Sequence, residues 1–326
     1  MKLTTKLSVL VFFLCRFAGV LMLALLFAGC EKEIEYTGDS VKPIMVLNSV
    51  IMEGEEITCN LSRSTSIFFD PSEQEEGNDL YNSDRSFRNG VQLELYCDGE
   101  LIGEPEWTGN DYRWSVVAEE GKEYHIRGHH DDYGAVEATT KVLAKPEIVD
   151  VQMQANSVQS QTNFSITLND EPGRNYYQLK ASCRMICIVY SDYEVTLVDT
   201  TEYSFYIYPN DAILNYNQAI TDGDGLAADN APNLFMIFDD ALFDGTSQEI
   251  KFYSSGLFEN DMYFSYQFLF ELRQISRELY LYYKSIDYYD YYGVSPFSEP
   301  VMIYSNVEGG AGILGSCNSA HYELVQ

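Results

Sequence analysis

Three of the four histidines lie close enough in the sequence to suggest a metal site. His125, His129 and His130 fall in one short segment, and Asp131 and Asp132 follow it directly. Imidazole nitrogens and carboxylate oxygens are common metal ligands. This spacing is not specific, however, and after a predicted strand it is more typical of a polar turn. We assign no metal ligand to the His125–His130 segment, and whether it binds a metal stays open.

A second segment with metal-binding chemistry is Asp222-Gly-Asp-Gly225, with Asp229 and Asn230 nearby. Carboxylate and amide oxygens are the ligands that Ca²⁺ prefers, but an EF-hand loop needs an oxygen ligand where Leu226 stands and a bidentate glutamate later. A surface turn is the favoured interpretation of Asp222–Asp224, with metal binding as the alternative. We predict no bound cofactor, and the sequence contains no Gly-x-Ser-x-Gly nucleophile motif that would place a catalytic serine.

Glycines at Gly309–Gly315 could be mistaken for a phosphate-binding loop. The segment lacks the Lys-Ser/Thr ending of such loops, and the formal net charge of −30 disfavours phosphate ligands. We predict instead that the glycines let the backbone pass close to another element. The same charge excludes nucleic acid as a partner, because the phosphate backbone would be repelled.

Tyrosines form the most suggestive candidate binding surface. They cluster between Tyr280 and Tyr292, and a tyrosine ring can stack on a ligand while its hydroxyl forms a hydrogen bond. We predict that Tyr282 and Tyr283 pack inward and that the later tyrosines lie in an acidic loop. The candidate ligand contacts are Tyr288, Tyr289, Tyr291 and Tyr292. Core packing is the alternative for the whole group.

The first forty residues predict a lipid anchor. The uncharged stretch Phe17–Gly29 is shorter than the ~20 residues that a membrane-spanning helix needs, and it fits the apolar core of a signal peptide. Cys30 follows the small residues Ala28 and Gly29, which resembles a bacterial lipobox. The resemblance implies cleavage before Cys30 and its acylation with chains such as palmitate, which would hold the mature protein to the outer-membrane lipid. A secretory signal with an unrelated cysteine, or an uncleaved anchor, is the alternative.

The residues behind Cys30 predict the side of the membrane. Glu31, Glu33 and Glu35 resemble the export signal that sends Bacteroidota lipoproteins to the outer cell surface, although a solvated tether is an equally simple interpretation. We expect an outer-membrane protein that faces the cell exterior. Residues 1–29 are then the signal peptide and residues 30–41 an acidic tether.

Five cysteines remain after the signal peptide is removed and Cys30 is acylated. They are Cys59, Cys97, Cys183, Cys187 and Cys317. Their odd number leaves at least one thiol unpaired within the chain. In one strand Cys183 and Cys187 would lie about 13 Å apart, too far for a disulfide. We expect most of the five to be small buried residues, and their pairing stays open.

Short alternating segments predict a mainly β protein. Val91, Leu93 and Leu95 alternate with polar residues, and Asp98-Gly99 follows as a hairpin turn. Segments of this length predict an immunoglobulin-like β-sandwich over residues 42–145. A boundary at Lys145-Pro146 precedes a second β-rich domain, residues 146–326. Its predicted strands include Tyr176–Leu179, Met185–Tyr190 and Tyr203–Tyr208. We predict one helix near the C-terminus, over Arg273–Ile286, from apolar residues spaced three and four apart.

Several stretches together resemble one protein family. They are Pro43–Ile51, Ile57–Ser64, Asn169–Gly173, Asn175–Tyr177, Phe238–Gly245, Ile275–Tyr280, Pro296–Pro300 and Ser305–Gly315. On these residues the chain is identified as a member of the Bacteroidota lipoprotein family that carries domain of unknown function 4249. The resemblance implies an outer-membrane lipoprotein, often encoded beside a TonB-dependent transporter. It implies no catalytic residues.

These observations favour a surface-exposed, non-enzymatic accessory to a TonB-dependent nutrient uptake system. It would bind or present a peptide, a glycan or another nutrient, with the transporter as its partner. The alternative is a structural or adhesive component of the cell surface, which would act by pairing strands with other chains. A hydrolase built from scattered carboxylates is the least favoured hypothesis, because spacing alone selects no catalytic pair. The oligomeric state stays open.

Overall fold

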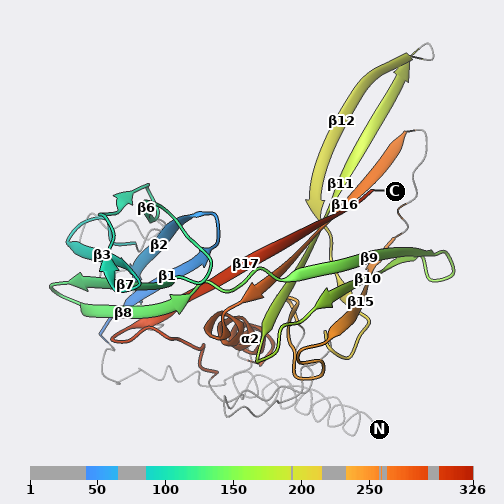
Figure 1. Cartoon of the computed structure of the whole chain (residues 1–326). Coiled ribbons are helices and arrows are strands. Elements are labelled where there is room, and N and C mark those ends of the chain that lie inside the picture. Colours follow the sequence, from blue (N-terminus) through green and yellow to red (C-terminus); the bar gives the residue numbers. More distant parts are fainter. Residues whose placement is uncertain are drawn as a thin grey trace, which may run out of the picture. The chain divides into compact units, whose positions relative to one another are not determined.

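The structure, a computed structural model, describes residues 42–64, 86–191, 194–214, 233–256, 258, 263–292 and 301–325 (Figure 1). Strands make up most of these residues. The prediction of a mainly β fold is confirmed, and the described residues contain one helix, near the C-terminus. Cys30 and the Asp222–Asp224 segment lie outside the described residues.

The strands form three sheets. The nine-stranded sheet has the order β12 (Glu194–Ser204), β11 (Tyr176–Ser191), β16 (Phe264–Ile275), β17 (Ala311–Val325), β1 (Met45–Met52), β2 (Glu56–Arg63), β6 (Tyr112–Val117) and β5 (Glu106–Trp107), with β14 (Ile237–Asp239) pairing with β11 off this path. A second sheet has the order β13 (Tyr208–Pro209), β15 (Ser247–Ser255), β10 (Gln161–Asn169) and β9 (Glu147–Asn156). The third has the order β4 (Glu100–Leu101), β3 (Val91–Cys97), β7 (Glu123–His130) and β8 (Gly134–Lys141).

The N-terminal core lies between two of these sheets. Leu47 and Trp114 enter it from β1 and β6 of the nine-stranded sheet, and Leu95 and Ile126 enter it from β3 and β7 of the third sheet. Every second residue of these strands is buried because neighbouring side chains in a strand point to opposite faces. Two sheets that share one core form a sandwich, as the alternation predicts.

The C-terminal core is rich in phenylalanine. Phe164 of β10 stacks on Phe252 of β15, with ring centroids 5.5 Å apart. It also meets Phe268 and Phe270 of β16 edge to face, at 5.2 and 5.5 Å. Aromatic pairs favour these offset and edge-on arrangements. The second sheet therefore packs its inner face against the part of the nine-stranded sheet that contains β16.

Strand β17 connects the first strand of the chain with the C-terminal strands. It pairs in parallel with β1, from Val46 opposite Ala311 to Met52 opposite Cys317, and antiparallel with β16. Hydrogen bonding therefore continues from the N-terminal strands into those of the C-terminal part. The domain boundary at Lys145-Pro146 stays a prediction.

The segment that leads into β17, residues 305–315, is tied to three strands, and we call it the C-terminal joint. Asn306 exchanges two hydrogen bonds with the backbone of Leu314, at 2.9 and 3.0 Å. The backbone of Glu308 pairs with that of Glu137 in β8. A Cβ atom at Gly312 would lie 2.0 Å from the carbonyl oxygen of Leu47, so no side chain fits there. The prediction that the glycines permit a close backbone approach is confirmed.

The helix α2 spans Arg277–Tyr292, so the predicted Arg273–Ile286 bounds are wrong at both ends. Residues 273–275 belong to β16, where Arg273 and Gln274 pair with both β11 and β17 and Ile275 pairs with β17. Ser276 then caps the helix, since its hydroxyl accepts the amide of Leu279 at 3.3 Å. Of the described helical residues, none lies in a stretch both long and apolar enough to cross a membrane.

Strand bounds differ from expectation in the middle of the chain. Tyr176–Leu179 and Met185–Tyr190 were expected as two strands, but both belong to β11, which pairs with β16 without a break up to Cys187. Residues 203–208 were expected as one strand, but β12 ends at Ser204 and β13 begins only at Tyr208. Tertiary pairing, which the local pattern does not contain, sets these ends.

Candidate functional site

Two loops connect the second sheet with the nine-stranded sheet, and we call them the crossover loops. Residues 170–175 lead from β10 to β11, and residues 240–246 lead from β14 back to β15. Asn169 pairs with Ser247 in one sheet, and Tyr176 pairs with Asp239 in the other. Because both ends of the two loops are paired, the loops lie side by side.

Asp170 joins the two crossover loops. Its Oδ1 accepts hydrogen bonds from the hydroxyl of Tyr177 at 2.5 Å and from Nδ2 of Asn175 at 3.3 Å. Its Oδ2 accepts the backbone amide of Gly245, across in the other loop, at 2.8 Å. The side chain is buried, so these bonds replace the water that a carboxylate would otherwise bind. Asp170 is therefore a bridge between the loops.

Asp240 and Asp244 face the first loop from the second. Asp240 Oδ2 accepts the backbone amide of Asn175 at 2.7 Å, and Asp244 Oδ1 accepts that of Gly173 at 2.9 Å. Asp240 is only 1% exposed, whereas Asp244 is exposed to solvent. One carboxylate oxygen each from Asp170, Asp240 and Asp244 lies within 4.8 Å of the others. The two loops therefore bring three carboxylates together around one point.

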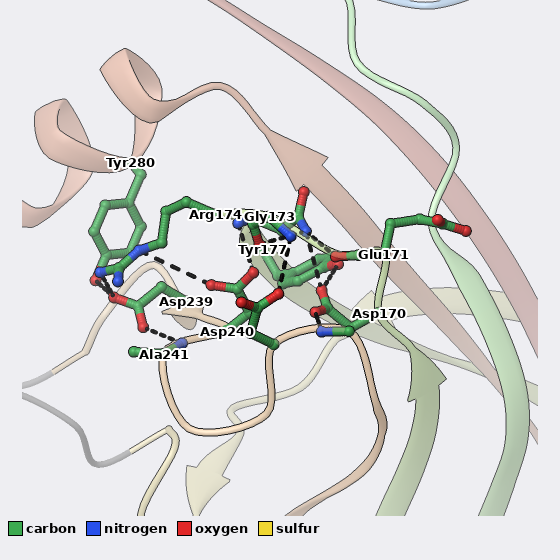
Figure 2. A network of polar contacts seen from close by, with 12 residues as sticks. Asp170, Glu171, Gly173, Arg174, Tyr177, Asp239, Asp240, Ala241 and Tyr280 are labelled. Carbon is green, nitrogen blue, oxygen red and sulfur yellow. Dashed lines mark hydrogen bonds and ion pairs between the residues drawn. The ribbon is translucent and has the colours of Figure 1, made fainter.

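Asp239 forms the other half of the network, on the side of the helix (Figure 2). Its Oδ2 accepts Nη2 of Arg174 at 3.1 Å and the hydroxyl of Tyr280 at 3.4 Å. Its Oδ1 accepts the backbone amide of Ala241 at 3.0 Å. The guanidinium of Arg174 also lies over the ring of Tyr176, at 5.7 Å from the ring centroid. Arg174 is thus oriented toward Asp239 by an ion pair and an aromatic face.

Asn175 holds the first loop in shape. Its Nδ2 donates to the carbonyl oxygens of Glu171 at 2.6 Å and Gly173 at 3.1 Å, and its Oδ1 accepts Nε2 of Gln274 at 2.7 Å. An asparagine that bonds to nearby backbone groups in this way is a common device for closing a tight loop. The loop shape therefore depends on one side-chain amide.

The network contains more carboxylates than paired cations. Among the described residues, Arg174 is the cation that pairs with these carboxylates, with its Nη2 3.1 Å from Asp239 and its Nε 3.9 Å from Oδ1 of Asp240. Burial raises the pKa of Asp240 to about 6; the amide of Asn175 and Arg174 oppose the rise, and the charge of Asp170 adds to it. Burial and the bond to Asp170 also raise the pKa of Tyr177. A cation, or a proton on one carboxyl, would relieve the repulsion.

Comparison with a family model settles the membership of the chain. A model described as a domain of unknown function, DUF4249, matches residues 31–323. The chain belongs to the DUF4249 family. The match covers all the stretches on which the sequence resembled that family, and it also covers both crossover loops and the C-terminal joint.

Other comparisons add little to the DUF4249 assignment. No curated protein matches the chain. A crystal structure of a Parabacteroides merdae beta-glucuronidase aligns with 88% of this chain and 25% of its own, at 9% sequence identity and a TM-score of 0.20. The chain thus spans about a quarter of that enzyme's length, and at this TM-score the alignment carries no argument about fold or activity.

The predicted tyrosines of this DUF4249 member are not in an acidic loop. Tyr288 and Tyr289 lie on α2, the first partly buried and the second 44% exposed. The backbones of Tyr291 and Tyr292 end the same helix, and their side chains lie outside the description. The inner face of the helix continues past Ile286 because Asp287, four residues after the inward-packed Tyr283, is buried and accepts the amides of Leu234 and Phe235. The role of the predicted tyrosines as ligand contacts stays a prediction.

Two tyrosines earlier on the helix behave as predicted. Tyr282 and Tyr283 pack against the small core beneath α2. The ring of Tyr283 stacks on Phe235, with centroids 4.4 Å apart and an interplanar angle of 15°. Core packing, the alternative for the whole group, therefore holds for these two.

The histidine segment is a strand, so the expectation of a polar turn is wrong for its residues. His125 to His130 lie in β7, paired with both β3 and β8. The ring of His125 contacts Thr139 and Glu137 on β8, at 2.9 and 3.5 Å. His130 accepts the amide of Asp132 through Nδ1. Alternation along the strand sends His129 and His130 to opposite faces, which separates them as joint ligands.

The five cysteines are free thiols in the described structure. Cys59, Cys183 and Cys317 are buried, as expected for small apolar residues, while Cys97 and Cys187 are partly exposed. Burial raises the pKa of the Cys183 and Cys317 thiols, which keeps both protonated and unreactive at neutral pH.

Sequence reasoning did not identify the crossover loops as a site. Asn169–Gly173 and Phe238–Gly245 contributed to the family resemblance, but no role was assigned to them. The signal was present: each loop starts with an aspartate directly after a strand and contains a second turn residue. The sequence does not show that the two loops are neighbours, because about seventy residues separate Asp170 from Asp240.

Proposed function

We propose that this DUF4249 protein is a surface-exposed outer-membrane lipoprotein that acts by binding rather than by catalysis. It is held in the membrane by acylated Cys30 and assists a TonB-dependent uptake system by binding or presenting a peptide, a glycan or another nutrient. The observation that carries the proposal is the placement of Cys30 directly after Ala28-Gly29 at the end of an uncharged signal-like stretch. The family match begins at residue 31, immediately behind it.

The crossover loops support a binding role. Asp170 accepts three hydrogen bonds from within the chain, and Asp239 is engaged by Arg174, Tyr280 and the amide of Ala241. Carboxylates that are occupied in this way position loops, and loops held between two sheets are common supports for recognition. The acidic tether of residues 30–41 would let such a body stand off the membrane.

Anchoring is tested by metabolic labelling with an alkyne palmitate in a Bacteroidota host. The wild-type protein should carry the label and remain with the outer membrane, whereas Cys30→Ser should lose the label and be released. Cys97→Ser is the matched control, since it removes a partly exposed thiol elsewhere. Equal labelling of all three proteins would overturn the anchor. Protease digestion of intact cells then reports whether the protein faces outward.

The transporter partnership needs a separate experiment. Gentle detergent extraction of the outer membrane, followed by affinity purification of the full-length protein, should recover a TonB-dependent transporter in a stoichiometric amount. The Cys30→Ser protein, purified from the same cells, controls for association after lysis. Recovery of the anchored protein alone under mild conditions would overturn this part of the proposal.

A structural or adhesive role is the second candidate, and one feature favours it. Strand β12 ends the nine-stranded sheet, so one of its edges is not paired within that sheet. Val198 and Tyr203 on this strand are exposed, and an open edge can add a strand from another chain. Deletion of the gene would then abolish cell attachment or surface assembly while leaving nutrient uptake intact, the reverse of what the leading proposal expects.

A further inference from the structure

The geometry points to a divalent cation site, best suited to Ca²⁺, formed by Asp170, Asp240 and Asp244 of the two crossover loops. This inference goes beyond the proposed function and does not depend on the lipid anchor or on any transporter. It rests on the convergence of three carboxylates, on a buried oxygen that accepts no hydrogen bond among the described residues, and on the all-oxygen character of the ligands.

The buried oxygen is Oδ1 of Asp240. The residue is 1% exposed, and this atom has no hydrogen-bond partner among the described residues. Its sister oxygen is occupied by the amide of Asn175 at 2.7 Å. The Nε of Arg174 lies 3.9 Å from Oδ1, at the limit of an ion pair, and the same guanidinium makes its closer contact with Asp239, at 3.1 Å. A buried carboxylate oxygen left in this state is costly unless something binds it.

Charge balance favours a cation over a neutral ligand. Asp170, Asp240 and Asp244 approach within 4.8 Å of one another, and like charges at that distance repel strongly away from bulk water. The other oxygen contacts of the three are with backbone amides, a hydroxyl and a side-chain amide, which orient the carboxylates without neutralising them. A divalent ion would offset two of the three negative charges.

Distances and ligand type select Ca²⁺ among common cations. Ca²⁺ binds six to eight oxygens at about 2.3–2.6 Å, so two of its ligands can stand up to roughly 5 Å apart. Mg²⁺ binds at about 2.0–2.1 Å, which limits that separation to roughly 4.2 Å. Separations up to the 4.8 Å bound suit Ca²⁺, whereas Mg²⁺ would need all three oxygens to stand closer together. Carboxylate oxygens alone, without nitrogen or sulfur, do not favour Zn²⁺.

Access and affinity follow from burial. Asp170 and Asp240 are buried, whereas Asp244 is exposed, so an ion would enter from the Asp244 side and keep water ligands there. Three protein carboxylates with water in the remaining positions suit a modest affinity. We expect a dissociation constant of about 10⁻⁴ to 10⁻³ M, as for extracellular calcium modules.

The test is a Ca²⁺ titration of the full-length protein in detergent, after treatment with a chelator. Isothermal titration should show one saturable site, and terbium, used as a Ca²⁺ mimic, should gain luminescence through tyrosine excitation because Tyr177 bonds directly to Asp170. Ca²⁺ should raise the unfolding temperature, because an ion that binds only the folded state stabilises it. Mg²⁺ at the same concentration should have a weaker effect.

Three variants make the test decisive. Asp240→Asn should weaken Ca²⁺ binding by at least about tenfold. Asp244→Asn should do the same with little risk to folding, since that side chain is exposed and an asparagine oxygen can still accept the amide of Gly173. Asp131→Asn makes the same charge change at an exposed turn position and should bind like wild type.

Two results would overturn the inference. One is the absence of a saturable site in wild type at millimolar Ca²⁺. The other is equal binding by wild type, Asp244→Asn and Asp131→Asn, which would mean that ions bind diffusely to the acidic surface. Misfolding of Asp240→Asn would not rescue the inference, because Asp244→Asn is read independently.

Discussion

The C-terminal joint and the crossover loops both hold strands that are far apart in the sequence, but they do so by different means. The joint relies on main-chain contact, with glycine at the closest approach to Leu47 and backbone pairing of Glu308 with Glu137. The crossover loops rely on side-chain carboxylates, of which Asp170 and Asp240 are buried. A main-chain contact is complete without further ligands, whereas buried charge stays sensitive to protons and ions.

The largest effect is expected at the joint, from Gly312→Ala. The residue has φ +111°, and its new Cβ would lie 2.0 Å from a carbonyl oxygen, so strain and overlap add. The free energy of unfolding should fall by about 3 kcal/mol or more, as measured by urea denaturation. Gly109→Ala is the matched control, because its φ of +113° imposes similar strain with open space around it. A loss of about 1–2 kcal/mol is expected there. Equal losses in both variants would contradict the close-approach account.

A smaller effect is expected in the crossover loops from Tyr177→Phe. The change removes the hydroxyl that donates to Asp170 at 2.5 Å and leaves a buried carboxylate with one donor fewer. We expect a loss of about 1–3 kcal/mol in the free energy of unfolding. Tyr253→Phe, on a ring stacked against Tyr208, should change it by less than about 0.5 kcal/mol. If Tyr177→Phe were equally silent, the bridge through Asp170 would carry little of the loop stability.

Asp287 shows the effect of burial on an acid outside the crossover loops, with a smaller contribution from the charge of Asp290. Burial on α2 raises its pKa to about 7, against the opposing hydrogen bonds from the amides of Leu234 and Phe235. The folded state then binds more protons than the unfolded state between about pH 4 and 7, so stability falls as the pH rises through that range. Asp287→Asn should remove this dependence and be more stable than wild type at pH 8 by at least about 1 kcal/mol.

The measurement for Asp287 is thermal unfolding of wild type and variant at pH 5 and pH 8. Asp131→Asn, which alters an exposed acid in the turn between β7 and β8, should follow wild type at both values. If the stability of wild type and Asp287→Asn changed equally with pH, burial alone would not destabilise the charged form of this acid. Repulsion between neighbouring carboxylates would then be the main reason that the crossover loops are sensitive to protons and ions.

The smallest effect is expected from Glu308→Ala. The side chain is exposed, and the residue takes part in the joint through its backbone bonds to Glu137, at 2.8 and 3.1 Å. The free energy of unfolding, measured by urea denaturation, should change by less than about 0.5 kcal/mol. Asn306→Ala, two residues away, removes both side-chain bonds to Leu314 and should cost about 1–2 kcal/mol. A large effect of Glu308→Ala would mean that the joint depends on side chains after all.

Local patterns predicted the strands well and their ends less well. The alternation of Val91, Leu93 and Leu95 corresponds to β3, because a strand with one buried face imposes that period. The helix was predicted to begin too early because Ile275, an apolar residue at helical spacing, belongs to β16, a strand that pairs with a neighbour on each side. Pairing with distant strands decides such positions, and a single segment contains no information about its partners.

The site was harder to predict than the fold for a related reason. Asp170 and Asp240 each look like an ordinary turn residue after a strand, and only the pairing of β10 with β15 and of β11 with β14 brings them together. The glycines of the joint were easier, since several glycines in one short segment already indicate a close approach. Chemistry contained in one segment can thus be anticipated, whereas chemistry shared between two loops requires the sheet order.

The parallel pairing of β1 with β17 has a consequence for how the chain matures. During synthesis β1 emerges long before β17, so the edge of β1 that pairs with β17 stays open until that strand has been made. Contacts this distant in sequence form slowly, and an open strand edge is a place where chains associate wrongly. A truncation that removes β17 would leave β1 and β16 each paired along one edge alone, β1 with β2 and β16 with β11. The nine-stranded sheet is therefore complete only when β17 has paired with both β1 and β16.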